Sequence, residues 1–492
     1  MLHRAVAQGW APIEKRLLPA LPKLHLTPSE RRLILVATDV AVISLGLLAA
    51  LALRGMSPFS PQTLLEAPRY FLLLSLVWAI WATFFECYDL PRSARAGQSA
   101  WGAGRASLAT ALTYLAIPVL TPHLLVSRFS ALLFVALLTV GMLVWRTFYA
   151  TVLTQPGFKQ RVLMVGAGPQ ARQLAHVLAS VPSVGNPYAG SGFELVGIVN
   201  GHHVAASAEM ADTPVLGGYG DLAALVEKHD IDLVVLATQP RGRAERRLLP
   251  VILDCREQGI SVESAASLYE RLTGKVLLDG AASDFGALLS EADWPILRMF
   301  SAAKRLFDVI IACFGLLVVL AAAPMVAVAN ACTSPGPLFF RQRRLGKGGK
   351  PFDMVKFRSM VPGAERQSGA VWAAKGDSRV TPMGRFLRAA RLDELPQFWN
   401  ILKGEMSLIG PRPERPEFIE ELVEAVPFYQ ARHAVRPGLT GWAQVRHGYG
   451  SSVEDARIKL QHDLYYIRHM GVYIELSIMV KTAAVMLGLR GR

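Results

Sequence analysis

Charged side chains are scarce in this chain. They account for 18% of its 492 residues, against about 25% in typical soluble domains. Apolar residues reach 52%, and the mean hydropathy is +0.31. These values exclude a disordered or collagen-like chain, because such chains contain too few apolar residues to build a core. The composition indicates a protein that is partly embedded in a membrane.

Cysteine is also rare. The four cysteines lie far apart and none is in a CxxC pattern, so neither a disulfide framework nor a zinc site is supported. Acidic residues are fewer than basic ones: the chain has 38 Asp and Glu against 52 Lys and Arg, which gives a net charge of +14. This excess suits anionic partners: phospholipid headgroups, phosphorylated substrates or nucleic acid. At about 150 residues a domain, the length predicts about three folded units.

Four apolar runs cover residues 33–53, about 70–88, 107–124 and 129–149. The first has the roughly 20 apolar residues that a bilayer-spanning helix needs, and the others are similar. Lys and Arg are concentrated before the first run, between the second and third, and directly after the fourth. By the positive-inside bias, the segment 1–32 and everything after residue 150 are cytoplasmic. We therefore predict a multi-pass protein with four transmembrane helices over 33–150.

Asp39 lies inside the first apolar run, where an acid is costly and is often functional. Because it is close to the cytoplasmic end of that run, we favour a structural role. In that role its side chain either snorkels to the interface or pairs with another helix.

Residues 159–295 alternate between strand-like and helix-like segments, which is typical of a Rossmann-like α/β domain with a parallel sheet. Gly166, Gly168 and Ala171 fit the GxGxxA pattern that lets backbone amides approach a pyrophosphate. However, Asn200 follows the strand after which an acid would bind a ribose, and Tyr269 is not part of a TyrxxxLys pair. We favour a domain without a cofactor. Nucleotide binding and a role in assembly both stay open.

The run 306–330 is long enough to cross the bilayer, but many cations follow it, which makes export of the C-terminal region improbable. Pro324 removes a backbone hydrogen bond and clashes with the carbonyl of Leu320, so we expect a kink there. A kinked helix can enter the membrane and turn back. We therefore predict a re-entrant helix, with a straight fifth span as the alternative.

Residues 334–360 combine a Pro/Gly turn with strand-like segments rich in cations, which favours either a phosphate cradle or a basic surface against anionic lipid. Further on, Arg385, Arg388 and Arg391 recur at helical spacing, directly before Asp393 and Glu394. Adjacent acids on a helix project about 100° apart, so they suit different tasks. Without their surroundings, they would be interpreted as ordinary acids at a helix start.

The surrounding motifs change that interpretation. KRLFDVIIA, SPGPLFFRQRRLG, VKFRSM, RLDELPQFWNILKGEMSLIGPRP, VRPGLTGWAQV and DLYYIRHM follow one another between about 304 and 485. In this order they resemble bacterial polyprenyl-phosphate hexose-1-phosphate transferases, the monotopic phosphoglycosyl transferases. The four apolar runs and the Rossmann-like domain resemble the long-form members of that family. One departure is Ala323, which precedes Pro324 where some members have Ser.

The resemblance implies a transferase domain over 304–492 and a mechanism. Asp393 would attack the sugar-bearing phosphate of a UDP-sugar, UMP would leave, and undecaprenyl phosphate would take the phosphosugar from the aspartyl intermediate. Asp393 would also bind Mg²⁺, and Glu394 would be the supporting acid/base. The resemblance assigns five cations to substrate phosphates: Lys356, Arg358, Arg388, Arg412 and Arg436.

The expected architecture is thus a four-helix transmembrane bundle, a Rossmann-like α/β domain, and an α/β catalytic domain with a re-entrant membrane helix. The expected partners are a UDP-hexose, undecaprenyl phosphate, membrane lipid and a second copy in a homodimer, but not nucleic acid. The resemblance implies the first membrane step of exopolysaccharide or capsule synthesis at the cytoplasmic face of the bacterial inner membrane. No residue separates glucose from galactose, and glucose is favoured. Two alternatives are a membrane-bound sugar-nucleotide oxidoreductase or dehydratase, and a non-catalytic scaffold.

Overall fold

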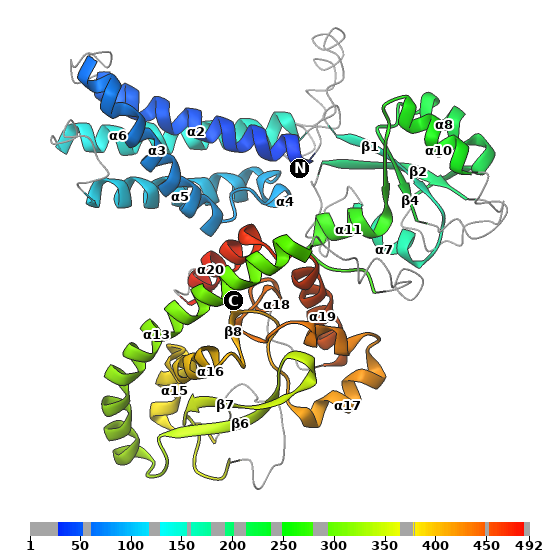
Figure 1. Ribbon diagram of the computed structural model, residues 1–492. Coiled ribbons are helices and arrows are strands. Elements are labelled where there is room, and N and C mark those ends of the chain that lie inside the picture. The colour runs from blue at the N-terminus through cyan, green and yellow to red at the C-terminus, as the bar shows by residue number, and fades with distance from the viewer. Residues whose placement is uncertain are drawn as a thin grey trace, which may run out of the picture. The chain divides into compact units, whose positions relative to one another are not determined.

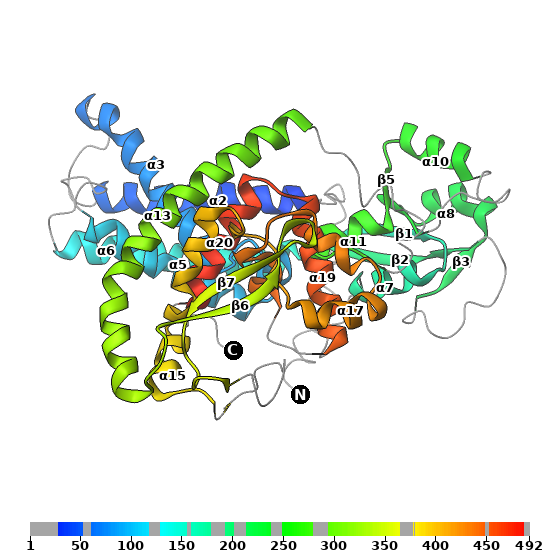
Figure 2. The ribbon, with the colours of Figure 1, turned by 60° about the horizontal axis from the view of Figure 1, so that its bottom comes forward.

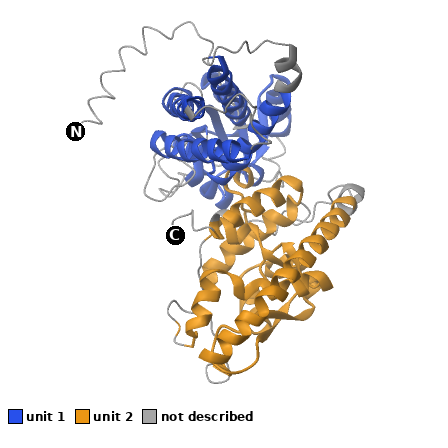
Figure 3. Ribbon diagram, turned by 90° about the vertical axis from the view of Figure 1, so that its left-hand side faces the viewer, with its two compact units in different colours: residues 1–268 blue, residues 269–492 orange. Residues whose placement is uncertain are grey.

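The computed structural model describes residues 28–52, 61–117, 128–154, 159–178, 192–200, 213–237, 248–278, 294–364, 377, 379–447 and 452–486. The chain divides into two compact units, residues 1–268 and 269–492 (Figure 3). Most of the predicted N-terminal segment 1–32 and the end of the third apolar run, 118–124, lie outside the described residues.

Four long helices of the first unit pack around one apolar cluster: α2 (Pro28–Ala52), α3 (Pro61–Phe84), α5 (Ala96–Ala116) and α6 (Arg128–Phe148). A short helix, α4 (Leu90–Ser93), precedes α5, and one π-helical turn, η2 (Tyr149–Leu153), continues α6. Leu47, Trp78 and Phe134 are at most 1% exposed in the shared cluster. Large apolar side chains also cover the outside, as on Leu72 and Leu132. Many exposed large apolar side chains are typical of a surface that faces lipid.

Three helices are long and apolar enough to cross a membrane within the described part of the chain: Glu30–Ala52, Phe129–Leu153 and Met299–Thr333. The apolar part of α3, Pro68–Phe84, is shorter. The helix α5 starts at Ala96 instead of 107, because its small residues and Arg105 are compatible with a helix although they are less apolar than the predicted span. Membrane association is thus supported, whereas four crossings within 33–150 stay a prediction.

Asp39 of α2 pairs with Arg146 of α6 inside this helix cluster. An Nη2 of Arg146 donates to Oδ2 of Asp39 at 2.5 Å, and Nε1 of Trp145 donates to its Oδ1 at 3.1 Å. The other end of the guanidinium donates to the carbonyl of Cys87 at 2.6 Å. Both charged side chains are at most 1% exposed. The predicted pairing of Asp39 with another helix is confirmed.

We expect Arg146→Leu to destabilise the protein by about 3–5 kcal/mol, because it leaves the Asp39 carboxylate buried without its partner. The double variant Asp39→Asn/Arg146→Leu should recover much of this loss, since Trp145 can still donate to the amide oxygen and no buried charge is left. Thermal unfolding in detergent measures both. Equal stability of the single and double variants would contradict the assignment.

A five-stranded parallel sheet forms the core of residues 160–264: β1 (Gln160–Val165), β2 (Phe193–Val199), β3 (Val215–Gly217), β4 (Leu233–Leu236) and β5 (Ser261–Ser264). The strand order is β3-β2-β1-β4-β5, the doubly wound order of a Rossmann-like fold. The associated helices are α7 (Pro169–Leu178), η4 (Tyr219–Asp221), α8 (Leu222–Lys228), α10 (Leu248–Glu257) and α11 (Ala265–Thr273). The predicted α/β fold is confirmed.

The turn between β1 and α7 has the geometry that its glycine pattern predicts. Gly166 has a φ of 105°, which only glycine adopts readily. Ala171, the third small residue of the pattern, is fully buried against the sheet.

The second unit begins within α11. It contains the 40-residue helix α13 (Trp294–Thr333) and the antiparallel strands β6 (Phe339–Leu345) and β7 (Pro351–Phe357), which are joined through η6 (Lys347–Gly349). Two short parallel strands, β8 (Ser407–Ile409) and β9 (Gly438–Thr440), form a second small sheet. The remaining elements are α15 (Pro382–Ala389), η7 (Leu392–Gln397), α16 (Phe398–Lys403), α17 (Pro416–Ala425), η8 (Tyr429–Ala434), α18 (Trp442–Arg446), α19 (Val453–Arg468) and α20 (Val472–Met486).

The helix α13 continues through Pro324 and changes direction along its length (Figures 1 and 2). Near its start, Arg305 donates to the carbonyls of Ile401 and Leu402 at 2.6 and 2.7 Å. On either side of Pro324, Val319 and Val326 pack into one cluster with side chains of β7 and α15. Both halves of the helix therefore contact the same folded unit, while its outer face exposes residues such as Phe314, Leu317 and Leu320.

Candidate active site

Asp393 and Glu394 lie in the first turn of the 3₁₀ helix η7. The preceding helix, α15, ends at Ala389, and Arg391 adopts the left-handed conformation with φ 59° and ψ 16°. Arg391 therefore does not continue the helical series of Arg385 and Arg388 that the sequence predicts. A left-handed residue is a common way to end a helix, although for arginine it costs roughly 1 kcal/mol. The break turns the two acids into a new direction.

Glu394 is held by three cations. Its carboxylate lies 3.0 Å from Nζ of Lys356, 3.5 Å from a guanidinium nitrogen of Arg412 and 3.9 Å from one of Arg391. Burial raises the pKa of Glu394, but the positive charges of Lys356, Arg412 and Arg391 outweigh it and lower the pKa to about 2. Glu394 is thus a permanent carboxylate at neutral pH. Its carboxylate orients the cations, and the acid/base role that the resemblance implies stays a prediction.

Asp393 has the opposite environment. Its side chain is 8% exposed, and among the described residues none donates a hydrogen bond to it or pairs with it. Burial and the neighbouring charge of Glu394 raise its pKa, against the opposing effect of Lys356, Arg388 and Arg391. A buried carboxyl group without a direct partner keeps its oxygen lone pairs available for a nucleophilic attack or for a cation.

The structure separates the five predicted phosphate-binding cations. Three lie near the two acids, whereas Arg436 and Arg358 do not contact them. Lys356 on β7 and Arg412 contact Glu394 directly, and Arg388 on α15 lowers the pKa of Asp393 while its Nε donates to Ser359 Oγ at 2.9 Å. Arg436 is exposed in the turn before β9, and its side chain makes no hydrogen bond or ion pair with the described residues. Lys356, Arg388 and Arg412 therefore surround the two acids.

Arg358 is used differently. It is 5% exposed, and its guanidinium donates to the carbonyl of Pro337 at 2.7 Å, to that of Met360 at 3.3 Å, and to both the carbonyl and the hydroxyl of Ser334 at 2.5 and 3.1 Å. Three of these four bonds are made to the segment that connects α13 to β6, and the fourth is made to the backbone that follows β7. This geometry differs from the predicted phosphate contact, and we assign Arg358 to support of that segment.

Two glycines bring the motifs GPRP and VRPG together. The strands β8 and β9 end side by side, with the amide of Gly438 donating to the carbonyl of Pro411 at 2.9 Å. A Cβ on Gly438 would lie 2.1 Å from the nitrogen of Gly410, and one on Gly410 would lie 2.4 Å from the carbonyl oxygen of Arg436. Only residues without a side chain allow this approach, which positions the turn with Arg412.

Asn400 is a site-supporting residue that the sequence reasoning missed. It is 1% exposed, its Oδ1 accepts from the amide of Val355 at 3.0 Å, and its Nδ2 donates to the carbonyl of Asp353 at 2.7 Å. These bonds hold β7, and with it Lys356, against α16. The one sequence feature that could have indicated this role is the position of Asn400, a polar amide, within the largely apolar stretch FWNILK.

A magnesium site built from protein ligands alone is not found, since the described residues contain no group of three or more Asp, Glu, His or Cys placed for a metal. The unpartnered carboxylate of Asp393 nevertheless fits Mg²⁺, which commonly takes one or two carboxylates and completes its shell with substrate phosphates and water. Three C-terminal histidines make hydrogen bonds within the protein instead, His447 with Asp455 and His462 and His469 with the carbonyls of Gly274 and Tyr465, each at 3.0 Å.

The fold and the site define a membrane-associated α/β protein with a buried acid beside a cation cluster. A family model described as "bacterial sugar transferase" matches residues 299–488, and one described as "CoA-binding domain" matches residues 83–266. The first match covers the site, and the second runs from the end of α3 to the start of α11.

Curated proteins extend the match. The UDP-N-acetylgalactosamine-undecaprenyl-phosphate N-acetylgalactosaminephosphotransferase of Aeromonas hydrophila is 40% identical over 282 residues, which cover 57% of this chain and 62% of that protein. The UDP-glucose:undecaprenyl-phosphate glucose-1-phosphate transferase of Xanthomonas campestris pv. campestris is 33% identical over 350 residues, 70% of each chain. The protein of the same name from Klebsiella pneumoniae is 30% identical over 338 residues, 66% of this chain and 67% of that protein.

This chain belongs to the bacterial sugar transferase family. The resemblance to polyprenyl-phosphate hexose-1-phosphate transferases that its motifs indicate is confirmed.

Proposed function

We propose that this protein transfers a sugar-1-phosphate from a UDP-sugar to undecaprenyl phosphate, with UMP as the second product. The observation that carries the proposal is the buried Asp393 carboxyl group, which has no direct partner among the described residues and lies beside three cations organised by Glu394. The cations match the negative charge of a diphosphate, and the carboxylate matches the need for a nucleophile. The names of the relatives support the same chemistry.

The reaction proceeds in two displacements at one phosphorus. An oxygen of ionised Asp393 attacks the sugar-bearing phosphorus, the bond to the bridging oxygen breaks, and UMP leaves with that oxygen. An oxygen of undecaprenyl phosphate then attacks the aspartyl-phosphosugar, and the Asp393 carboxylate is released. No proton has to be transferred when both phosphate groups are ionised, which agrees with a Glu394 that stays a carboxylate.

The cations stabilise the charge that develops on the phosphate oxygens. Lys356 and Arg412 are held by Glu394, so they are in position before substrate binds and need little reorganisation. Arg388 lies close enough to Asp393 for its positive charge to lower the pKa of that carboxyl group. Asp393 would hold Mg²⁺, which would supply further neutralisation of the phosphate charge.

The membrane helix α13 presents the site to a lipid substrate. We propose that it enters the bilayer and turns back, because Arg305 near its start and Val326 beyond Pro324 both contact the same folded unit. A straight span would separate these contacts by the roughly 30 Å of the hydrocarbon core. This arrangement and the positive-inside bias support the predicted place at the cytoplasmic face of the inner membrane.

Glucose is the sugar that the family resemblance favours, and the relatives named above act on glucose or on N-acetylgalactosamine. The transfer would be the first membrane step of exopolysaccharide or capsule synthesis. A homodimer stays a prediction.

The test is UMP release by the purified full-length protein in detergent with Mg²⁺, undecaprenyl phosphate and, in turn, UDP-glucose, UDP-galactose and UDP-N-acetylgalactosamine. We expect lipid-dependent UMP from one of these sugars, which also identifies the donor. An absence of UMP with every sugar would overturn the proposal and favour a non-catalytic scaffold.

A further inference from the structure

The turn Pro411–Glu414, which carries Arg412, is fixed through the backbone carbonyl of every one of its residues. Gly438 donates to the carbonyl of Pro411 at 2.9 Å, and Leu345 donates to that of Glu414 at 3.0 Å. The two carbonyls between them accept from arginine side chains: that of Arg412 from Arg432 at 3.1 Å, and that of Pro413 from Arg344 at 3.1 Å.

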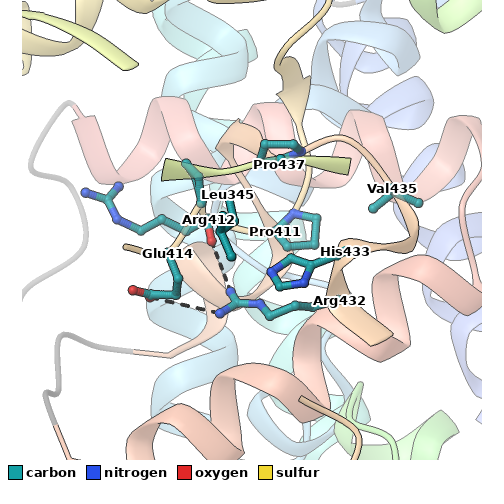
Figure 4. A pocket seen from close by; sticks show the side chains of 10 residues that line it. Leu345, Pro411, Arg412, Glu414, Arg432, His433, Val435 and Pro437 are labelled. Atoms are coloured by element: carbon teal, nitrogen blue, oxygen red, sulfur yellow. Dashed lines mark hydrogen bonds and ion pairs between the residues drawn. The ribbon is translucent and has the colours of Figure 1, made fainter. Parts of the chain in front are cut away.

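Arg432 is the more deeply buried of these two arginines, with 4% of its side chain exposed. The same Nη2 that bonds the Arg412 carbonyl donates to Oδ2 of Asp463 at 2.7 Å. Its Nη1 contacts the hydroxyl of Tyr429. The same Nη1 lies 4.0 Å from Glu414, and Figure 4 shows this pair. A buried guanidinium is therefore neutralised by Asp463 and aimed at the backbone of the turn.

The Arg412 side chain needs such a support. It is 36% exposed and reaches Glu394 at 3.5 Å. In Figure 4 the Arg412 side chain extends away from Arg432. Arg432 therefore contacts the backbone of Arg412 and not its guanidinium. A long exposed side chain is directed mainly by its backbone, and a displacement of about 1 Å at a reacting phosphate can cost about 10²-fold in rate.

We propose that Arg432, neutralised by Asp463, is a positioning residue that holds the Arg412 guanidinium beside Glu394 for the transferring phosphate. The inference rests on the proposed function. Arg432 touches no substrate, and its effect on the reaction passes through Arg412.

A double-mutant cycle tests this dependence. Arg432→Lys keeps a positive charge for Asp463, but one ammonium group cannot reproduce the fork that meets both the carboxylate and the carbonyl. We expect it to lower kcat/KM for UMP release by about tenfold in the wild-type background and by less than about twofold in the Arg412→Ala background, because contacting residues are coupled. An equal loss in both backgrounds would mean a general structural role and would overturn the proposal.

Arg468→Lys is the matched control. Arg468 also pairs with a buried acid, Glu270, at 2.8 Å, but it has no bond to the turn 411–414. We expect Arg468→Lys to change kcat/KM for UMP release by no more than about twofold. The change should be the same with and without Arg412→Ala, because the two residues are not coupled. If Arg432→Lys does not fold, Arg344→Gln replaces it in the cycle. This substitution removes the hydrogen bond to the carbonyl of Pro413, and the Arg344 side chain is 15% exposed.

Hydrogen exchange of the full-length protein supplies a readout that is independent of catalysis. We expect faster exchange in the peptide 407–415 of Arg432→Lys and an unchanged peptide 393–400. Unchanged exchange in 407–415 would overturn the positioning role even if activity fell. A wild type that releases no UMP would overturn the proposed function, and the exchange data would still decide whether Arg432 orders the turn.

Discussion

Asp393→Asn is expected to lower UMP release by about 10⁴-fold or more, the size of loss seen when a covalent nucleophile is removed. The amide keeps the shape of the side chain but cannot form the aspartyl-phosphosugar. With a UDP-sugar labelled in the sugar and no lipid acceptor, the wild type should retain label on the protein after denaturation, and hydroxylamine should release it. The variant should retain none.

The stability of the same variant separates a lost nucleophile from a lost fold. The folded state raises the pKa of Asp393, chiefly through burial, so ionisation of this group opposes folding at neutral pH. This penalty is absent at low pH and grows as the pH rises past the ordinary Asp value of about 4. We therefore expect Asp393→Asn to unfold at the same temperature as the wild type or higher at pH 7, with the difference vanishing below about pH 4.

An active Asp393→Asn variant, or one that forms the labelled protein, would mean that another group is the nucleophile. An inactive variant with a clearly lowered unfolding temperature would contradict the assigned environment of Asp393.

Lys356→Met is expected to lower kcat/KM by about 10²- to 10³-fold, the usual effect of losing one preorganised group that stabilises developing charge. Lys356 contacts Glu394 at 3.0 Å and is one of the cations that oppose the raised pKa of Asp393. Removing it should raise the pKa of Asp393 further.

The pH dependence of the reaction tests this second effect. Asp393 attacks only when ionised, so kcat/KM falls as the pH drops through its pKa, which lies above the usual Asp value of about 4. In Lys356→Met this fall should begin at higher pH. Glu394, with a pKa of about 2, contributes no titration in the working range.

Lys403→Met is the matched control for this experiment. Lys403 lies on α16, is 49% exposed and lies 3.8 Å from Glu405, and it is not among the charges that shift the pKa of Asp393 or Glu394. Its replacement should leave both the rate and the pH profile unchanged. An identical shift in both variants would show that the effect is a general one of net charge and not of the contact with Glu394.

Local patterns predicted several elements of the fold. The apolar run 306–330 lies within α13, and the GxGxxA pattern forms the predicted turn between β1 and α7. Both depend on neighbouring residues in the chain, so hydropathy and spacing are sufficient. The third apolar run was harder, because α5 starts at Ala96, where small residues form a helix without high hydropathy.

Contacts between distant residues were not predictable in the same way. Arg432 and Asp463 lie 31 positions apart and each resembles an ordinary surface charge in the sequence, yet they form a buried pair. Arg358 stood in a cationic motif, and only its four bonds to nearby backbone and Ser334 reveal a supporting role. The spacing of Arg385, Arg388 and Arg391 predicted a continuous helix, whereas Arg391 adopts the left-handed conformation.

The sequence by itself determined the family, the acid pair Asp393–Glu394, and the apolar segments that associate with a membrane, because motifs and hydropathy are properties of contiguous residues. Only the tertiary structure decided how the two acids differ. Glu394 meets Lys356 across 38 residues, and Asp393 is buried without a direct partner among the described residues. The reason is that the pKa of a carboxyl group depends on burial and on charges within a few ångströms, which the packing of β7, η7 and the turn with Arg412 sets.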